Sequence, residues 1–160
     1  MRISTTRFGE INIAPGKIIT VPDGLPGLDA FKRYALLSTE ETDPFHWLQA
    51  LDAADVSLAV INPYLLFPEY KPMVPEEVFE QLGAGNTEDV LVLTVAVIPR
   101  EFRSMTTNLL APILVNTKNN VGKQVILDNS EYDLRHPIFD KIRKLVQKGG
   151  ASDAGADQKN

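Results

Sequence analysis

Side chains that could perform acid–base or metal chemistry are scarce in this chain. It contains no cysteine and only two histidines, His46 and His136. Without cysteine there is no disulfide, no thiolate metal site and no cysteine nucleophile. The two histidines lie far apart and fit neither an HxH nor an HExxH spacing, so a metal site is not indicated. We therefore predict no metal and no cofactor.

Motifs for phosphate binding and nucleophilic catalysis are also missing. The chain has no GxGxxG, no GxSxG, and no GxxxxGK followed by Ser or Thr. Its paired acids, such as Glu40-Glu41 and Glu76-Glu77, are adjacent and therefore poorly placed to face one another as an acid–base pair. We predict that the protein is not an enzyme. A catalytic cluster assembled from distant parts of the chain is the alternative that the sequence leaves open.

An aromatic loop is a better candidate for function. Between Asn62 and Pro72 the chain carries Tyr64, Phe67 and Tyr70 among three prolines. One interpretation is that these rings plug the core. The other is that they form exposed anchors, because aromatic side chains on rigid loops are frequent interface hot spots.

The charge distribution also points to a surface. The segment from Glu40 to Asp89 contains eleven acidic residues and one basic residue, Lys71, for a net charge of −10, although the whole chain carries −5. The acids could simply keep the protein soluble. They could instead form a face that steers a basic protein partner. Direct nucleic-acid binding is not expected, since it requires a basic footprint.

The elements that would position these residues are mostly strands. Apolar runs and alternating patterns, bounded by Pro, Gly and Asn, predict eight of them. The first two are expected to pair as an antiparallel hairpin through Pro15-Gly16. The Val90–Ile98 run, VLVLTVAVI, is uninterrupted, which is typical of a strand covered on both faces. The predicted strands are Phe8–Ile13, Lys17–Val21, Tyr34–Ser38, a strand within Pro44–Leu51, Ser57–Ile61, Val90–Ile98, Leu109–Val115 and Val121–Leu127.

Helical patterns are few. Pro75–Leu82 has a helix-starting proline, two acids and a following Gly83. Pro137–Gln147 has apolar residues at helical spacing, and Asp29–Arg33 could form one turn. The fold class is therefore mainly β, a small closed or partly open antiparallel β-barrel with one or two short helices, since closure removes exposed edges.

The domain organisation follows from the same patterns. Residues 1–148 are predicted to form a single domain. The polar stretch 149–160 is predicted to be a disordered tail, because it is poor in apolar residues. The start of the chain lacks the apolar core of a signal peptide, and no apolar run approaches the roughly 18 residues of a membrane span. A cytoplasmic location without membrane contact is the simplest expectation.

Two motifs in the second half of the chain carry a family resemblance. They are Asn108-Leu-Leu-Ala-Pro-Ile113 with Asn116, and Gln124-Val-Ile-Leu127 with Tyr132 and Arg135-His136. With them, the chain from Met1 to Phe139 resembles the FliW family of flagellar assembly factors. Val21-Pro22 departs from the Phe-Pro that is common in that family. We expect the amides of Asn108, Asn116 and Gln124 to satisfy backbone groups at turns and strand ends.

The resemblance implies a non-enzymatic binding protein with a β-barrel-like fold. FliW-like proteins bind flagellin, and they bind and antagonise CsrA, a basic RNA-binding translational repressor. The alternative is a small barrel that binds a small molecule or acts as an uncharacterised enzyme, which a pocket with a perturbed titrating group would favour. The candidate partner-binding residues are Asn62, Tyr64, Phe67, Glu69, Tyr70, Glu76, Glu77, Arg103, Asn108 and His136.

Overall fold

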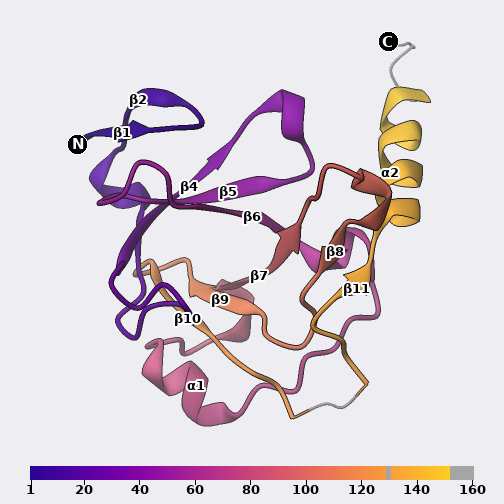
Figure 1. Cartoon of the computed structure of the whole chain (residues 1–160). Coiled ribbons are helices and arrows are strands. Elements are labelled where there is room, and N and C mark those ends of the chain that lie inside the picture. Colours follow the sequence, from indigo (N-terminus) through magenta and orange to yellow (C-terminus); the bar gives the residue numbers. More distant parts are fainter. Residues whose placement is uncertain (129–130, 152–160) are drawn as a thin grey trace.

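The computed structural model describes residues 1–128 and 131–151. Strands dominate the described part, together with two α-helices and short 3₁₀ turns (Figure 1). The elements are β1 (Arg2–Thr5), β2 (Gly9–Asn12), β3 (Ile18–Thr20), β4 (Arg33–Ser38), β5 (His46–Ala50), β6 (Ser57–Ile61), α1 (Glu76–Gln81), β7 (Val90–Val97), β8 (Thr106–Thr107), β9 (Ile113–Asn116), β10 (Val121–Gln124), β11 (His136–Pro137) and α2 (Phe139–Ala151).

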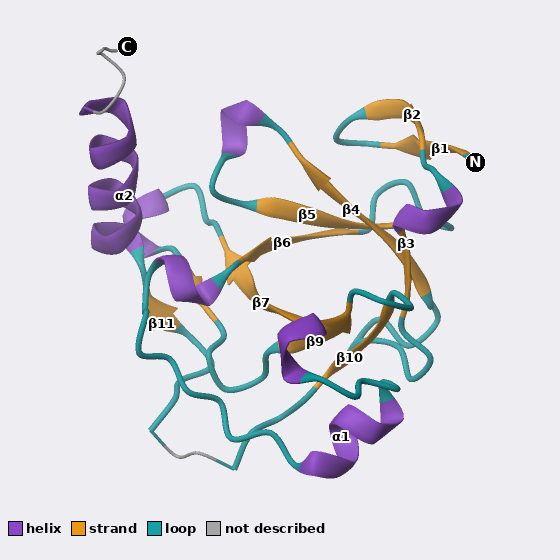
Figure 2. Cartoon of the chain, turned by 180° about the vertical axis from the view of Figure 1, so that it is seen from behind, coloured by secondary structure: helices purple, strands orange, loops and turns teal. Residues whose placement is uncertain are grey.

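Seven of these strands close into a barrel, in the order β7-β6-β5-β4-β3-β10-β9, with β9 pairing back onto β7. Neighbouring strands are antiparallel except β3 and β10, which pair in parallel. The closed, mainly β fold predicted from the sequence is therefore confirmed. Figure 2 shows the same ring from behind, with β8 and β11 extending from the end of β7.

Strand β7 holds the barrel together because it pairs with three other strands. Its first half, from Val90 to Leu93, pairs with β9. Its second half pairs with β6 on one edge and with β8 on the other. Leu93 packs inside the barrel, whereas Ala96 packs against the outer cluster near α2. Both faces of β7 therefore have apolar neighbours, which explains its uninterrupted apolar sequence.

Apolar residues pack in four clusters, one inside the barrel and three on its outer face. The inner cluster includes Tyr34, Val60 and Ile113. Outside, α2 covers a second cluster, α1 a third, and the β1–β2 hairpin a fourth. No helix among the described residues is long and apolar enough to cross a membrane.

The predicted hairpin between Phe8–Ile13 and Lys17–Val21 is wrong. Strand β2 pairs with β1 instead, and Pro15–Lys17 is a 3₁₀ turn. The reason is local: the Thr5 hydroxyl donates to the Gly9 carbonyl and accepts from the Phe8 amide, both at 2.8 Å. Gly9 adopts the positive φ of 70° that this tight turn requires. Strand β3 pairs with β4 and β10.

Several element boundaries also differ from the predictions. The expected strand Leu109–Val115 begins only at Ile113, because Asn108 and Pro112 hold the preceding residues in an irregular turn. The turn at Asp29 does not develop into a helix, since β4 begins at Arg33. Helix α2 continues to Ala151, so residues 149–151, which were predicted to belong to the disordered tail, are helical. The rest of the predicted tail, residues 152–160, lies outside the described residues, and its disorder stays a prediction.

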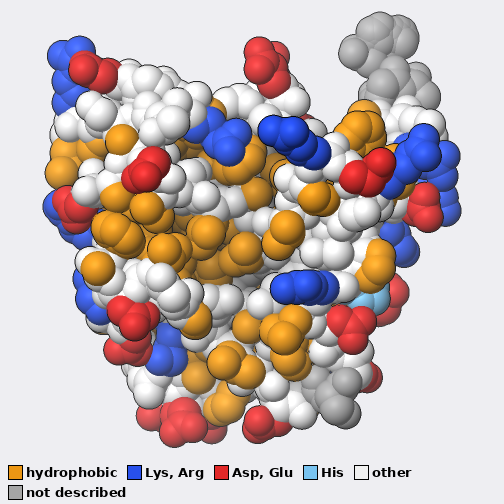
Figure 3. Space-filling model, viewed as in Figure 1, with side chains coloured by type: hydrophobic (Ala, Val, Ile, Leu, Met, Phe, Trp, Pro, Cys, Tyr) orange, Lys and Arg blue, Asp and Glu red, His pale blue; other side chains and the backbone are white. Residues whose placement is uncertain are grey.

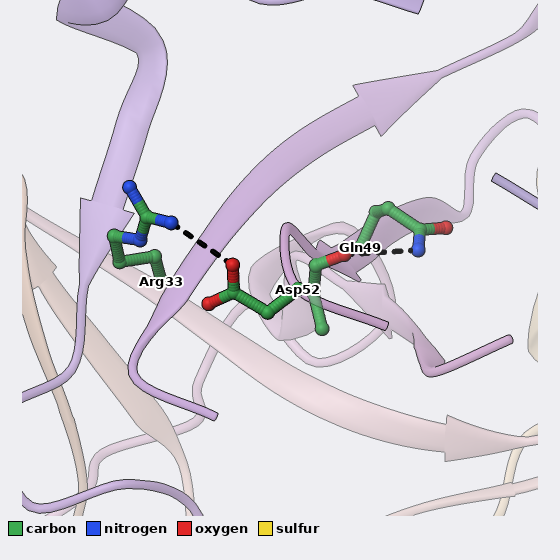
Figure 4. A network of polar contacts seen from close by, with 4 residues as sticks. Arg33, Gln49 and Asp52 are labelled. Carbon is green, nitrogen blue, oxygen red and sulfur yellow. Dashed lines mark hydrogen bonds and ion pairs between the residues drawn. The ribbon is translucent and has the colours of Figure 1, made fainter. Parts of the chain in front are cut away.

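A buried amide fixes the loop between β5 and β6 (Figure 4). Gln49 is fully buried, and its Nε2 lies 3.1–3.2 Å from the carbonyl oxygens of Ala50, Ala53, Ala54 and Val56. An amide group has two N–H donors, so these four acceptors share them. Beside this network, Arg33 donates to Asp52 at 2.9 Å.

Candidate partner-binding surface

An apolar groove lies between helix α1 and the aromatic loop, on the outer face of the barrel. Its main part has a volume of about 430 Å³, and a neighbouring hollow of about 330 Å³ shares Val74, Phe79 and Thr87 with it. We call the two together the α1 groove. Half-buried Val90 and Val92 of β7 and the buried Leu114 of β9 line its base, next to the contact between α1 and the barrel. The main part is lined by Tyr64, Tyr70, Lys71, Pro72, Val74, Phe79, Thr87, Glu88, Val90, Val92 and Leu114, of which Lys71 is the one basic residue.

Tyr70 is a rigid part of the groove wall. It is 5% exposed, and its hydroxyl donates to the Leu109 carbonyl at 2.6 Å. Its ring packs edge-to-face against Tyr132 at 4.8 Å between centroids, and Tyr132 in turn accepts the Lys71 amide proton. Burial, and secondarily the neighbouring Tyr64 and Tyr132, raise the pKa of Tyr70 far above its usual value. The phenol therefore stays protonated at neutral pH.

Tyr64 is the ring that the groove presents to solvent. It is 38% exposed and lies against Tyr70, with 5.7 Å between ring centroids. Asn62 positions it: the Asn62 side-chain oxygen accepts the Tyr64 amide proton at 3.0 Å and caps the 3₁₀ turn Pro63–Leu65. Asn62 thus holds the backbone at Tyr64 in place, and its side-chain oxygen is already engaged in a hydrogen bond with that backbone.

Phe67 and His136 lie together but do not line the groove. Their rings meet edge-to-face with 5.0 Å between centroids, and the Lys141 Nζ of α2 lies 5.3 Å from the Phe67 ring. His136 Nδ1 is 3.2 Å from an Asp133 carboxylate oxygen. The aromatic loop therefore contacts the groove through Tyr64 and Tyr70, and contacts β11 and α2 through Phe67.

Acidic side chains surround the groove. Glu76 and Glu80 line the smaller hollow and Glu88 lines the larger one. Glu69 and Glu77 are exposed nearby on the loop and on α1 but line neither hollow. None of these acids forms an ion pair with a residue that the structure describes. Figure 3 shows acidic side chains below the hydrophobic ones at the α1 end of the molecule.

Two predicted contact residues lie apart from the groove. Arg103 is exposed in the 3₁₀ turn Phe102–Ser104, which packs beside α2. The Asn108 side-chain oxygen accepts from the amides of Leu110 and Ala111 at 3.1 and 3.0 Å, so it serves the backbone.

Sequence reasoning missed several residues of the groove, namely Phe79, Val90, Val92 and Leu114. A usable signal was the alternation along β7, which places Val90 and Val92 on one face. Whether that face is covered depends on where α1 and the aromatic loop lie. The sequence of β7 does not determine the position of either.

The groove contains few side chains suited to acid–base or metal chemistry. No group of three or more metal-ligating side chains is present among the described residues. The titrating groups that burial perturbs, Tyr64 and Tyr70, have raised pKa values, and the Tyr70 hydroxyl is already engaged by the backbone. A phenol held neutral in this way is not a general base.

The fold and the groove define a small closed-barrel protein with an apolar surface groove and no group of three or more metal-ligating side chains among its described residues. The family model described as "FliW protein" matches residues 2–138. The flagellar assembly factor FliW of Alkaliphilus metalliredigens is 35% identical over 158 residues, covering 98% of each chain. That of Thermoanaerobacter pseudethanolicus is 39% identical over 144 residues, covering 89% of this chain and 96% of the relative.

The fold comparison agrees with the sequence comparison. A crystal structure of the flagellar assembly factor FliW superposes with a TM-score of 0.81 at 32% identity, covering 87% of this chain and 97% of the other. The chain belongs to the FliW family and is a flagellar assembly factor.

Proposed function

We propose that this flagellar assembly factor acts in the cytoplasm by binding flagellin, and by binding and antagonising a CsrA-like RNA-binding regulator, so that repression of flagellin translation is relieved. It does so without catalysis and without contacting nucleic acid itself. The observation that carries the proposal is the α1 groove, an apolar hollow bordered by acids. A basic protein that also presents an apolar side chain is the complementary partner.

The acids and the apolar base of the groove have different roles in this proposal. Glu69, Glu76 and Glu77 are exposed and have no described ion-pair partner, so their field extends into solvent. Such charges mainly accelerate association with an oppositely charged protein, and salt screens them. The apolar residues of the groove slow dissociation, because burying them removes apolar surface from water.

The electrostatic part is tested by replacing Glu69, Glu76 and Glu77 together with Lys. We expect the association rate with a purified CsrA-like regulator to fall by about tenfold at low salt, and the difference to shrink at high salt. The matched control replaces Asp29, Glu40 and Asp55 with Lys. These acids are also exposed, and the net charge changes by the same amount. Equal slowing by both triple variants would refute a local acidic surface, and salt-independent binding would refute steering.

The aromatic part is tested with Tyr64→Ala. Tyr64 is the exposed ring of the groove wall, so its removal should weaken the binding of the regulator by about 1–2 kcal/mol while leaving the fold intact. Leu65→Ala is the control, since Leu65 is a neighbouring exposed apolar residue that does not line the groove. Identical losses from both variants would show that the groove is not the contact.

Competition between flagellin and the regulator completes the proposal. A domain of this size has limited room for two standard interfaces of about 800 Å² per partner. The aromatic loop offers a route for coupling, because it walls the groove on one side and contacts α2 through Phe67 on the other. Thermodynamic linkage requires each partner to lower the binding affinity of the other by the same factor. A stable ternary complex in size exclusion with light scattering, with unaltered pairwise affinities, would refute competition.

A small-molecule site is the second candidate, and the volume of the groove favours it. About 430 Å³ falls within the usual range for ligand pockets, and the lining is largely apolar. A fragment screen by NMR, with chemical shifts mapped onto Phe79, Val92 and Leu114, separates the two functions. Tight, saturable binding of a small molecule without effect on the protein partners would favour this alternative.

A further inference from the structure

A second hollow lies on another part of the molecule, where the β4–β5 turn, the end of β7 and α2 meet. It has a volume of about 420 Å³ and shares no lining residue with the α1 groove. Its apolar part consists of Pro44, Phe45, Trp47, Ile98 and Ile142. Ile98 is 40% exposed, whereas the other four are buried, so Ile98 supplies most of the apolar surface that contacts water.

The hollow carries an arginine whose guanidinium group lies over an aromatic ring. The guanidinium carbon of Arg7 lies 3.7 Å from the centroid of Trp47. The tight β1–β2 turn fixes the Arg7 backbone through Thr5, as described above. The indole is fixed as well, since Trp47 Nε1 donates to the Thr42 hydroxyl at 3.1 Å. Both stacked groups are therefore held in place before any ligand arrives.

The hydrogen-bonding edge of this guanidinium is unused. Arg7 forms no hydrogen bond or ion pair through its side chain with any described residue. Stacking engages the face of the planar group and leaves its N–H donors free in the plane, where they match a carboxylate in a two-bonded arrangement.

Opposite charge is present in the same hollow. Glu41 and Asp43 line it from the β4–β5 turn, and neither forms an ion pair with Arg7 or with another described residue. The hollow therefore combines one cation, two carboxylates and an apolar base. A purely acidic ligand would meet repulsion from the two carboxylates, whereas a segment of mixed charge would satisfy both signs.

We propose that this hollow, the Arg7–Trp47 cleft, binds a segment of a partner protein that places an Asp or Glu side chain on Arg7, an apolar side chain against Ile98, and a Lys or Arg side chain toward Glu41 and Asp43. The site is independent of the α1 groove and of the partners proposed for it. Its affinity arises from a preorganised cation and an apolar contact, both of which lower the cost of ordering on binding.

Trp47 makes the test direct, because it is the only tryptophan of the chain. The probe is the blocked peptide acetyl-Gly-Glu-Leu-Lys-Gly-amide, titrated to millimolar concentration while the Trp47 indole N–H resonance is followed by ¹H–¹⁵N NMR. We expect a saturable shift of this resonance. The neutral peptide acetyl-Gly-Gln-Leu-Gln-Gly-amide should bind about tenfold more weakly. A peptide whose only carboxylate is its C-terminus should bind no better than the neutral one.

Variants of the protein complete the experiment. Arg7→Gln should lower the affinity for the charged peptide to that for the neutral peptide. Arg7→Lys should recover only part of the affinity, since an ammonium group cannot form two parallel hydrogen bonds with a carboxylate. Arg2→Gln, an exposed arginine of the same hairpin, is the matched control and should change nothing. The NMR spectrum verifies that each variant is folded. Equal affinity for charged and neutral peptides, or full affinity in Arg7→Gln, would overturn the proposal.

Discussion

Replacing Asn116 with alanine probes how α1 is attached to the barrel. Asn116 ends β9 and is 2% exposed. Its Nδ2 donates to the carbonyl of Leu82, the C-cap residue that follows α1, at 3.0 Å. Its Oδ1 accepts the Lys118 amide proton at 3.0 Å. The Leu82 carbonyl is one of the acceptors that a helix leaves unsatisfied at its C-terminal end. Asn119 donates to the same oxygen, also at 3.0 Å.

The expected loss of stability follows from these bonds. Asn116→Ala removes both of these hydrogen bonds. The Lys118 amide loses its acceptor, whereas the Leu82 carbonyl keeps Asn119 as a donor. We estimate about 1.5–3 kcal/mol from the usual cost of such losses. For a domain of this size that corresponds to a decrease in Tm of roughly 3–12 °C. Adding Asn119→Ala should cost more than the sum of the single variants, because the Leu82 carbonyl then loses both donors.

Thermal unfolding followed by circular dichroism measures these values. The control is Asn12→Ala, an exposed asparagine of β2 whose side chain has no described hydrogen bond. We expect its Tm to stay within about 1 °C of the parent, as for most surface substitutions. An unchanged Tm in Asn116→Ala would refute the structural role. Lost partner binding at unchanged Tm would show that Asn116 is a contact residue.

Four further predictions concern other parts of the chain. Gln49→Leu should lower stability by about 1–3 kcal/mol in urea unfolding, because the carbonyls of Ala50, Ala53, Ala54 and Val56 lose the donor they share, although the last three also accept backbone amides; an unchanged midpoint would contradict this. Gly24→Ala should destabilise by at least about 1 kcal/mol, since φ is +71° and a Cβ would lie 2.9 Å from backbone. Lys123 lowers the pKa of Asp23, so NMR should show this carboxyl titrating below its usual range and returning to it in Lys123→Gln; the ion pair's contribution is present above that range and lost as pH falls through the lowered pKa. Deleting Gly150–Asn160 should leave Tm and flagellin affinity unchanged.

Much of the secondary structure could be predicted because it is locally encoded. The Ser57–Ile61 strand was located correctly at both ends, since Asn62-Pro63 stops it and a short apolar run defines it. The helix expected at Pro75–Leu82 forms as α1, with Gly83 at φ 70° after it. The two strands predicted at Leu109–Val115 and Val121–Leu127 form as β9 and β10. The asparagines between them suit the turn that joins them, in which Asn120 adopts φ 57°.

Strand pairing and the surface were harder to predict. Patterns of period two identify a strand but not its neighbour, so the β1–β2 hairpin was missed. The aromatic loop showed the same limit: composition could not say which ring is buried. The structure buries Tyr70 and exposes Tyr64, six residues apart, because only Tyr70 reaches the carbonyl of Leu109.

The sequence alone determined the class of protein: a mainly β domain with an acidic middle segment, no metal-binding spacing and the FliW motifs. These features reside in residue types and short spacings, so no contact has to be known to recognise them. Only the tertiary structure decided where binding surfaces lie. The α1 groove exists because barrel closure brings β7 beside β9 while α1 leaves part of that face uncovered, and Arg7 meets Trp47 because the β1–β2 turn reaches β5. Such long-range packing depends on the whole set of competing contacts, which no local pattern records.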